Sequence, residues 1–168
     1  EVPERTIISE DKDAPNHILI EGDNLEALAT LAYTHEGKID IIYIDPPYNT
    51  GNNDFIYNDS YVDKEDSYRH SKWLSFMSRR LRIAKKLLSD YGVIFISIDD
   101  NEQADLKILC DSIFMPSNFC GQFIWRKKSG GGQTDRYFVT EHEYILVYQA
   151  TNKFCWKDIQ IEKSRKNY

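Results

Sequence analysis

The feature that most constrains the fold is a run of apolar, largely β-branched residues, Ile39–Ile44, that ends before two consecutive prolines. This composition predicts a strand that is covered on both faces of a parallel sheet. Pro46 and Pro47 have no backbone N–H to donate to a neighbouring strand, so the strand must stop there. The run therefore predicts a buried parallel strand followed by a rigid loop at its carboxyl end.

Strand and helix patterns alternate along the rest of the chain. Further strands are predicted at 17–20, 93–98, 119–125 and 144–148, and helices at 25–31, 74–88 and 106–113. Residues 52–70 and 128–140 have no clear period, and the second of these segments is rich in glycine. Strands that alternate with helices favour an α/β layered domain.

Polar residues at the helix ends suggest where each helix begins or stops. Asp23 or Asn24 is expected to cap the first helix, and Gly92 is expected to end the second. The third helix is expected to be capped by one residue of the run 99–101, Asp-Asp-Asn. These caps place short polar turns directly after the predicted strands.

Length and composition are those of a globular domain. The 168 residues are 41% hydrophobic and 29% charged, and no stretch approaches the roughly 20 apolar residues of a membrane span. We expect a polar lead-in at 1–15, a main unit at 16–150 and the start of a following segment at 151–168, as though the chain were truncated. The three cysteines lack metal-ligand spacing, and the amino terminus lacks a signal-peptide pattern, so a cytoplasmic protein with reduced thiols is expected.

Charge is unevenly distributed, although the net value is −6. Residues 1–63 carry 14 acidic and 3 basic side chains, whereas residues 64–168 carry 13 acidic and 18 basic ones. Two basic clusters could contact a polyanion, and they are Arg79, Arg80, Arg82, Lys85 and Lys86, and Arg126, Lys127 and Lys128. A solvated helix face is an equally good interpretation of the first cluster.

The sequence Asp45-Pro46-Pro47-Tyr48 follows the predicted strand, at the end where open α/β sheets bind ligands. The Asp45 carboxylate and the Pro46 carbonyl can each accept one hydrogen of an aromatic amine. Two fixed acceptors free the nitrogen lone pair for attack and offset the positive charge that develops as a methyl group arrives. Tyr48 offers a flat face on which an extruded base can stack, whereas a rigid turn is the plain structural alternative.

The same tetrapeptide resembles the fourth motif of the amino-methyltransferases, whose first position is Asp mainly in adenine N6 enzymes. The segments 21–28, 38–44, 125–132 and 141–148 also resemble the β group of that family, specifically the modification subunits of type III restriction–modification systems. The resemblance implies a partial Rossmann-like class I methyltransferase sheet with flanking helices. It also implies S-adenosylmethionine as cofactor and double-stranded DNA with a flipped adenine as substrate.

Roles for individual residues follow from that resemblance. Asp45, Pro46, Pro47 and Tyr48 are the implied catalytic residues, Asp23 and Asp45 the cofactor-binding ones, and Arg126, Lys127, Lys128, His142 and Tyr144 the DNA-binding ones. A helix cap remains the alternative for Asp23, and ordinary strand positions remain the alternative for His142 and Tyr144. No metal is expected, because the histidines at 17, 35 and 70 form no ligand pattern in the sequence.

Three interpretations of function stay open. The first is an adenine N6 DNA methyltransferase of a restriction–modification system, with a homodimer and a restriction subunit as possible partners. The second is a cytosine N4 methyltransferase, and the third is a catalytically silent DNA-docking or assembly fragment. The family's cofactor motif, Phe-x-Gly-x-Gly, does not occur in the sequence, which favours a fragment.

Overall fold

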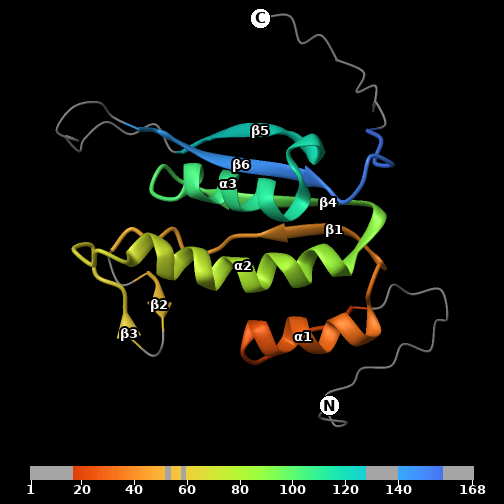
Figure 1. The fold of residues 1–168 in the computed structure, drawn as a ribbon, viewed down its shortest axis with the longest axis horizontal. Coiled ribbons are helices and arrows are strands. Elements are labelled where there is room, and N and C mark those ends of the chain that lie inside the picture. Colours follow the sequence, from red (N-terminus) through yellow and green to blue (C-terminus); the bar gives the residue numbers. More distant parts are fainter. Residues whose placement is uncertain (1–16, 52–53, 58–59, 128–139, 157–168) are drawn as a thin grey trace, which may run out of the picture.

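The computed structural model describes residues 17–51, 54–57, 60–127 and 140–156, and these residues form an α/β domain (Figure 1). Its helices are α1 (Asn24–Thr34), α2 (Arg69–Leu87) and α3 (Gln103–Phe114). Its main sheet contains β1 (Ile39–Ile44), β4 (Leu88–Ile98), β5 (Phe119–Arg126) and β6 (His142–Gln149). Two short strands, β2 (Ile56–Tyr57) and β3 (Ser60–Tyr61), form a separate antiparallel pair, and a 3₁₀ turn, Pro116–Asn118, precedes β5. The predicted α/β class is confirmed.

The main sheet has the strand order β1-β4-β6-β5 and mixes parallel and antiparallel pairing. β1 runs parallel to β4, with Ile44 opposite Ile96. β6 runs antiparallel to β4 and to β5. The carboxyl ends of β1, β4 and β5 therefore meet the amino end of β6 at one edge of the sheet, on the left in Figure 1.

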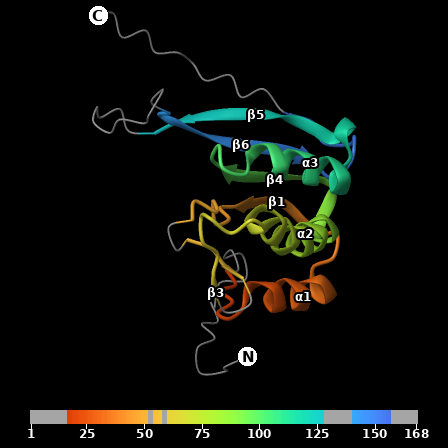
Figure 2. The same ribbon diagram turned by 60° about the vertical axis from the view of Figure 1, so that its left-hand side comes forward.

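The hydrophobic core lies between one face of the sheet and the helices α2 and α3. Every second residue of β4 faces these helices, because side chains alternate between the two faces of a strand. The core includes Ile94, Ile96 and Ile98 of β4, Trp73, Met77 and Leu81 of α2, and Leu106 and Phe114 of α3. α2 and α3 thus cover the same face, and α1 packs beyond α2 (Figure 2).

The opposite face of β1 is open, which corrects the prediction of a strand covered on both faces. Ile42 and Ile44 pack against the core, but Ile41 and Tyr43 are 67% and 61% exposed. The sequence pattern was that of a doubly covered strand, whereas both helices in the described residues that follow β1 lie on one side. The bounds of the strand, Ile39–Ile44, match the prediction.

Residues 17–20 do not form the predicted buried strand. They have no regular secondary structure and are exposed, with Leu19 at 95% exposure. An apolar run of four residues becomes a strand only where a neighbour accepts its backbone hydrogen bonds, and the sheet order includes no strand from this segment. The prediction was therefore wrong in the described structure.

The long helix ends earlier than predicted, and Gly92 has a different role. α2 stops at Leu87 and β4 begins at the next residue, so Gly92 lies within a strand. A Cβ added at Gly92 would lie 2.9 Å from the Ile39 carbonyl oxygen. Glycine is required there because β1 and β4 approach closely, at the point where their register shifts between Ile39 and Ile41.

The helix caps were predicted with mixed success. Asp23 caps α1, because its carboxylate accepts from the backbone N–H groups of Leu25 at 2.9 Å and Glu26 at 3.2 Å. The residue that precedes α3 is Glu102 rather than one of 99–101, and its side chain makes no capping bond. The Asp99 side chain instead bonds to Asn101, both backbone and side chain, so the third cap was predicted wrongly.

Candidate active site

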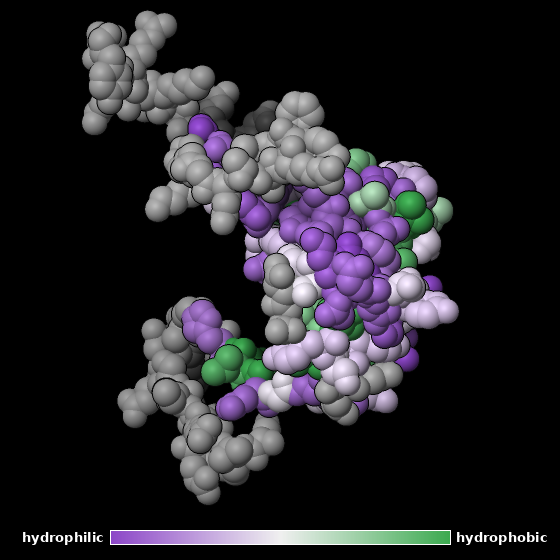
Figure 3. Space-filling model, turned by 90° about the vertical axis from the view of Figure 1, so that its left-hand side faces the viewer, coloured by the Kyte–Doolittle hydropathy of each residue, from purple (hydrophilic) through white to green (hydrophobic). Residues whose placement is uncertain are grey.

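A cavity of about 250 Å³ lies where β1 and β4 end, beside the Asp45–Tyr48 loop. Its lining combines two carboxylates with several aromatic rings, and consists of Tyr43, Asp45, Tyr48, Ser97, Trp125, Glu143, Tyr144 and Ile145. The surface at this edge is largely hydrophilic (Figure 3). Pockets that take drug-sized ligands measure roughly 300–1,000 Å³, so this cavity suits a single heterocyclic base.

The strand register brings these side chains together from distant parts of the sequence. The Tyr43 hydroxyl lies 2.5 Å from the Ser97 hydroxyl across the β1–β4 pair. Tyr144 lies opposite Ile98 at the start of β6, and its hydroxyl donates to Asp100 at 2.7 Å. Polar groups from the loops after β1 and β4 and from the first residues of β6 therefore lie together at this edge.

Tyr48 is half-buried and belongs to both the cavity and the core. Burial is the main cause that raises the pKa of its phenol, and a hydrogen bond to the Asp45 carboxylate raises it further. The phenol is thus neutral at physiological pH, which keeps the ring face uncharged. The Lys127 ammonium lies 6.0 Å from the centroid of this ring and pairs with Glu143 at the rim.

One buried contact and one uncommon backbone conformation define the shape of the loop. Trp73 of α2 is fully buried, and its indole N–H donates to the Pro47 carbonyl at 2.6 Å. The Pro47 carbonyl is therefore engaged, whereas the acceptor role predicted for the Pro46 carbonyl stays a prediction. Asn49, directly after Tyr48, has a left-handed φ of 57° and is fully buried.

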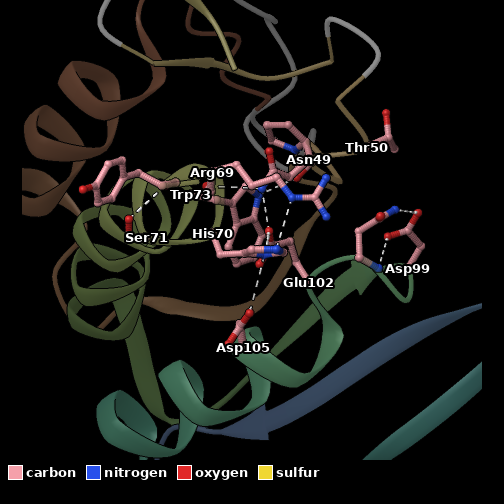
Figure 4. Close-up of polar contacts among 12 residues, drawn as sticks. Asn49, Thr50, Arg69, His70, Ser71, Trp73, Asp99, Glu102 and Asp105 are labelled. Carbon is pink, nitrogen blue, oxygen red and sulfur yellow. Dashed lines mark hydrogen bonds and ion pairs between the residues drawn. The ribbon is translucent and has the colours of Figure 1, made fainter. Parts of the chain in front are cut away.

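A polar cluster lies behind this loop (Figure 4). Ligand atoms of His70, Glu102 and Asp105 lie within 4.8 Å of one another, a grouping that the sequence pattern did not indicate. The expectation that the protein binds no metal stays a prediction. His70 Nδ1 is 2.7 Å from Glu102 Oε1. Two atoms that ligate the same ion through bonds of about 2.0–2.2 Å lie roughly 3 Å or more from each other. The contact between His70 and Glu102 is shorter than that, so it is a hydrogen bond.

The predicted DNA-binding residues are only partly brought together. Lys127 and Tyr144 contact the cavity or its rim, and the His142 ring nitrogen lies 2.9 Å from the Tyr144 hydroxyl. Arg126 pairs with His142 in the β5–β6 ladder but is not among the lining residues. Lys128 and the glycine-rich residues 129–137 fall outside the described residues.

The basic cluster on α2 does not belong to the site. α2 leads directly into β4, so its last turn, with Lys85 and Lys86, lies at the edge opposite Asp45. The Arg80 guanidinium packs 3.4 Å from the Phe76 ring centroid, and Lys85 donates to a backbone carbonyl of α3 at 2.5 Å. These contacts favour a structural role for Arg80 and Lys85.

Sequence reasoning missed several lining residues. Tyr43 could have been found, because it lies two positions before Asp45 in a strand and so shares its face. Ser97, Trp125 and Glu143 depend on the pairing of β4, β5 and β6, which no local pattern specifies. Glu102, which lies behind the loop and does not line the cavity, carried no signal either, since an acidic residue at a helix start is ordinarily solvated.

The fold and site together define an α/β domain with an acidic, aromatic cavity at the carboxyl edge of its sheet. Residues 39–168 match the model of the DNA methylase family of N6 and N4 methyltransferases. The chain belongs to this family. No helix in the described part of the chain is both long and apolar enough to cross a membrane.

Curated relatives are similar over most of this chain. It is 37% identical to the Mod subunit of the type III restriction-modification enzyme EcoP15I of Escherichia coli, over 88% of this chain and 27% of that protein. It is 39% identical to the StyLTI Mod subunit of Salmonella typhimurium (98% and 28%), and 44% identical to the type II methyltransferase M.KpnI of Klebsiella pneumoniae (81% and 33%). The chain therefore spans about a third or less of the length of these relatives.

Solved structures share the fold. A DNA modification methylase of Thermus thermophilus has a TM-score of 0.57 at 22% identity, covering 83% of this chain and 54% of the other. The cytosine-N4-specific PvuII DNA methyltransferase has a TM-score of 0.56 at 13% identity, covering 77% and 48%. The expected partial class I methyltransferase sheet is thus confirmed.

Proposed function

We propose that this chain is the catalytic part of a DNA methyltransferase that transfers a methyl group from S-adenosylmethionine to the exocyclic amino group of a flipped adenine. The observation that carries the proposal is the cavity that joins Asp45 and Tyr48 at the edge of the sheet. Its size suits one base, and its rings and carboxylates suit an aromatic amine. The similarity to Mod subunits supports the same conclusion.

The carboxylates also fit the cofactor that the family implies. Asp45 and Glu143 both line the cavity, and negative groups suit a positively charged sulfonium. S-adenosylmethionine, when bound, supplies an electrophilic methyl group. Asp45 and Asp23 are the residues of this chain proposed to hold it, although Asp23 also caps α1.

The residues of the loop would act on the amine. Asp45 accepts one amino hydrogen and the Pro46 carbonyl accepts the other, which favours a tetrahedral nitrogen whose lone pair is less delocalised into the ring. The carboxylate then offsets the positive charge that develops on nitrogen. Tyr48 stacks on the extruded base, an interaction worth roughly 1–3 kcal/mol. The bonds from Trp73 and Asn49 hold these groups in place before the base arrives.

Adenine N6 is preferred over cytosine N4 as the acceptor because Asp occupies position 45. Cytosine N4 remains the second candidate, because the PvuII enzyme, which is cytosine-N4-specific, shares the fold. The names of the relatives also support a type III modification subunit. A restriction subunit and a second copy of this protein are the proposed partners, and the cytoplasm is the proposed location.

Replacement of Asp45 with Ala in the full-length protein tests the proposal. Loss of one preorganised group of this kind costs about 10²–10³ in rate, while cofactor binding should stay measurable by calorimetry. Transfer of tritiated methyl groups to duplex DNA, with adenine or cytosine replaced at the modified site, identifies the acceptor base. Near-normal methyl transfer by Asp45→Ala would reject the assignment. A full-length wild-type protein without methyltransferase activity would favour the alternative of a DNA-docking or assembly protein.

A further inference from the structure

Glu102 is a buried carboxylate that contacts the residue directly after the catalytic loop. It is 1% exposed and precedes α3 without capping it. Its Oε1 accepts from Asn49 Nδ2 at 2.5 Å and lies 2.7 Å from His70 Nδ1 (Figure 4). The three side chains come from the β1 loop, α2 and the start of α3, so the cluster joins three elements behind the site.

The proton positions in this cluster follow from the neighbouring arginine. Arg69 Nε lies 3.1 Å from His70 Nε2, and a guanidinium only donates hydrogen bonds. His70 Nε2 therefore accepts, so Nδ1 carries the proton and donates to Glu102. Two donors, from His70 and Asn49, thus converge on one oxygen of the carboxylate. Burial raises the pKa of Glu102, and these two hydrogen bonds act in the opposite direction by favouring the ionised form.

Asn49 connects the Glu102 cluster to the backbone of the catalytic loop. Its positive φ of 57° is a conformation that asparagine tolerates better than most residues. Besides Glu102, its Nδ2 also donates to the Arg69 carbonyl at 3.3 Å. The backbone that leaves Tyr48 is therefore held in an uncommon conformation by a side chain whose main acceptor is Glu102.

Stability alone does not explain this cluster. Glu102 Oε2 and Asn49 Oδ1 are buried and have no hydrogen-bond partner among the described residues. Burial disfavours an ionised carboxylate and a half-satisfied amide, so an apolar pair would suit a purely structural site better. A helix cap is also excluded as the reason, because the Glu102 side chain makes no bond to the first turn of α3.

We propose that Glu102, oriented by His70, is a positioning residue for methyl transfer that holds Asp45 and Tyr48 through Asn49. The inference rests on the proposed function. Glu102 touches neither substrate nor cofactor, and its effect is on the placement of groups that do. A misplacement of about 1 Å at a reacting centre can cost roughly 10²-fold in rate.

Glu102→Gln in the full-length methyltransferase is the first test. The amide keeps the size of the side chain, but it removes the charge and replaces Oε2, which is buried without a partner, by an NH₂ group. We expect kcat to fall by about 10–100-fold with little change in KM, because placement affects the transition state more than substrate binding. Asp105→Asn is the matched control, since Asp105 lies 3.7 Å from His70 at 42% side-chain exposure and should transfer methyl groups at the wild-type rate.

Exchanging the hydrogen-bond donor and acceptor between positions 49 and 102 gives a sharper test. Asn49→Asp places a second carboxylate against Glu102 and should slow transfer more than Glu102→Gln does. The double variant Asn49→Asp, Glu102→Gln restores one hydrogen bond with donor and acceptor exchanged. It should be at least about tenfold faster than Asn49→Asp alone. A double variant no faster than Asn49→Asp would overturn the proposal.

A measurement independent of catalysis reports on loop position. The Trp73 indole N–H, bonded to the Pro47 carbonyl, should exchange with solvent faster in Glu102→Gln than in the wild type. If Glu102→Gln fails to fold, His70→Ala removes one donor from a half-exposed position and should give a smaller loss of kcat. Wild-type exchange and wild-type kcat would refute the positioning role, whereas activity in Asp45→Ala would instead refute the proposed function.

Discussion

Replacement of Trp73 with Phe should destabilise the domain by an amount that the structure predicts. Trp73 is fully buried in the first turns of α2, and its indole N–H is bonded to the Pro47 carbonyl at 2.6 Å. Phe keeps an aromatic ring in the core but removes the donor. The variant therefore leaves a carbonyl of the catalytic loop without its partner.

Two terms contribute to the expected loss of stability. A carbonyl that loses its partner in a buried site costs about 1–3 kcal/mol. The smaller ring leaves a cavity of roughly 40 Å³, which at about 24 cal/mol per Å³ adds about 1 kcal/mol. The sum of about 2–4 kcal/mol corresponds to a fall in Tm of about 4–16 °C for a domain of this size.

Thermal unfolding followed by circular dichroism measures this difference. Trp156→Phe is the matched control, because Trp156 is 57% exposed and the same chemical change should cost less than about 0.5 kcal/mol. Equal Tm values for the two variants would show that the bond to Pro47 contributes nothing to stability. That result would refute the argument that α2 fixes the loop.

Two further predictions concern the loop and the core. Gly51→Ala should lower Tm, because φ at Gly51 is 81° and the new Cβ would lie 2.6 Å from Lys64 Cβ; a Tm equal to that of the wild type would contradict the close approach. The hydrogen bond from Lys107, and a weaker one from Tyr148, hold the pKa of Asp111 below its usual range. Asp111 therefore stabilises the fold fully above its unfolded pKa of about 3.9 and loses this effect as pH falls through the lower folded value. Asp111→Asn should cost about 1 kcal/mol at pH 7 and less at pH 2, whereas an equal loss at both pH values would exclude a charge effect.

The elements that could be predicted from the sequence are those with a strong local signal. Ile39–Ile44 is a strand with the predicted bounds, and the prolines after it place Asp45 at the ligand-binding edge. Residues 17–20 had a comparable apolar pattern but form no strand, because a strand also requires a partner that the pattern does not reveal. Gly92 was misassigned for a related reason: a close approach between strands and a helix end both favour glycine.

The residues behind the catalytic loop could not be predicted, because their roles depend on contacts between distant segments. Asn49 and Glu102 are separated by 53 positions, and His70 and Glu102 by 32. Each looks ordinary in its own segment: an asparagine after a turn, a histidine near the start of one helix, and a glutamate before the start of another helix. Only the packing of α2 and α3 on one face of the sheet brings them together.

The mixed pairing of the sheet explains which half of the site was found from the sequence. In a parallel sheet, functional residues follow the carboxyl ends of strands, and this rule located Asp45. β6 is antiparallel to β4, so its first residues, Glu143 and Tyr144, reach the same edge from the opposite chain direction. The hairpin with β5 adds Trp125 at the edge where that strand ends. One wall of the cavity therefore follows the parallel rule and the other depends on an antiparallel hairpin, which a pattern of alternating strands and helices does not predict.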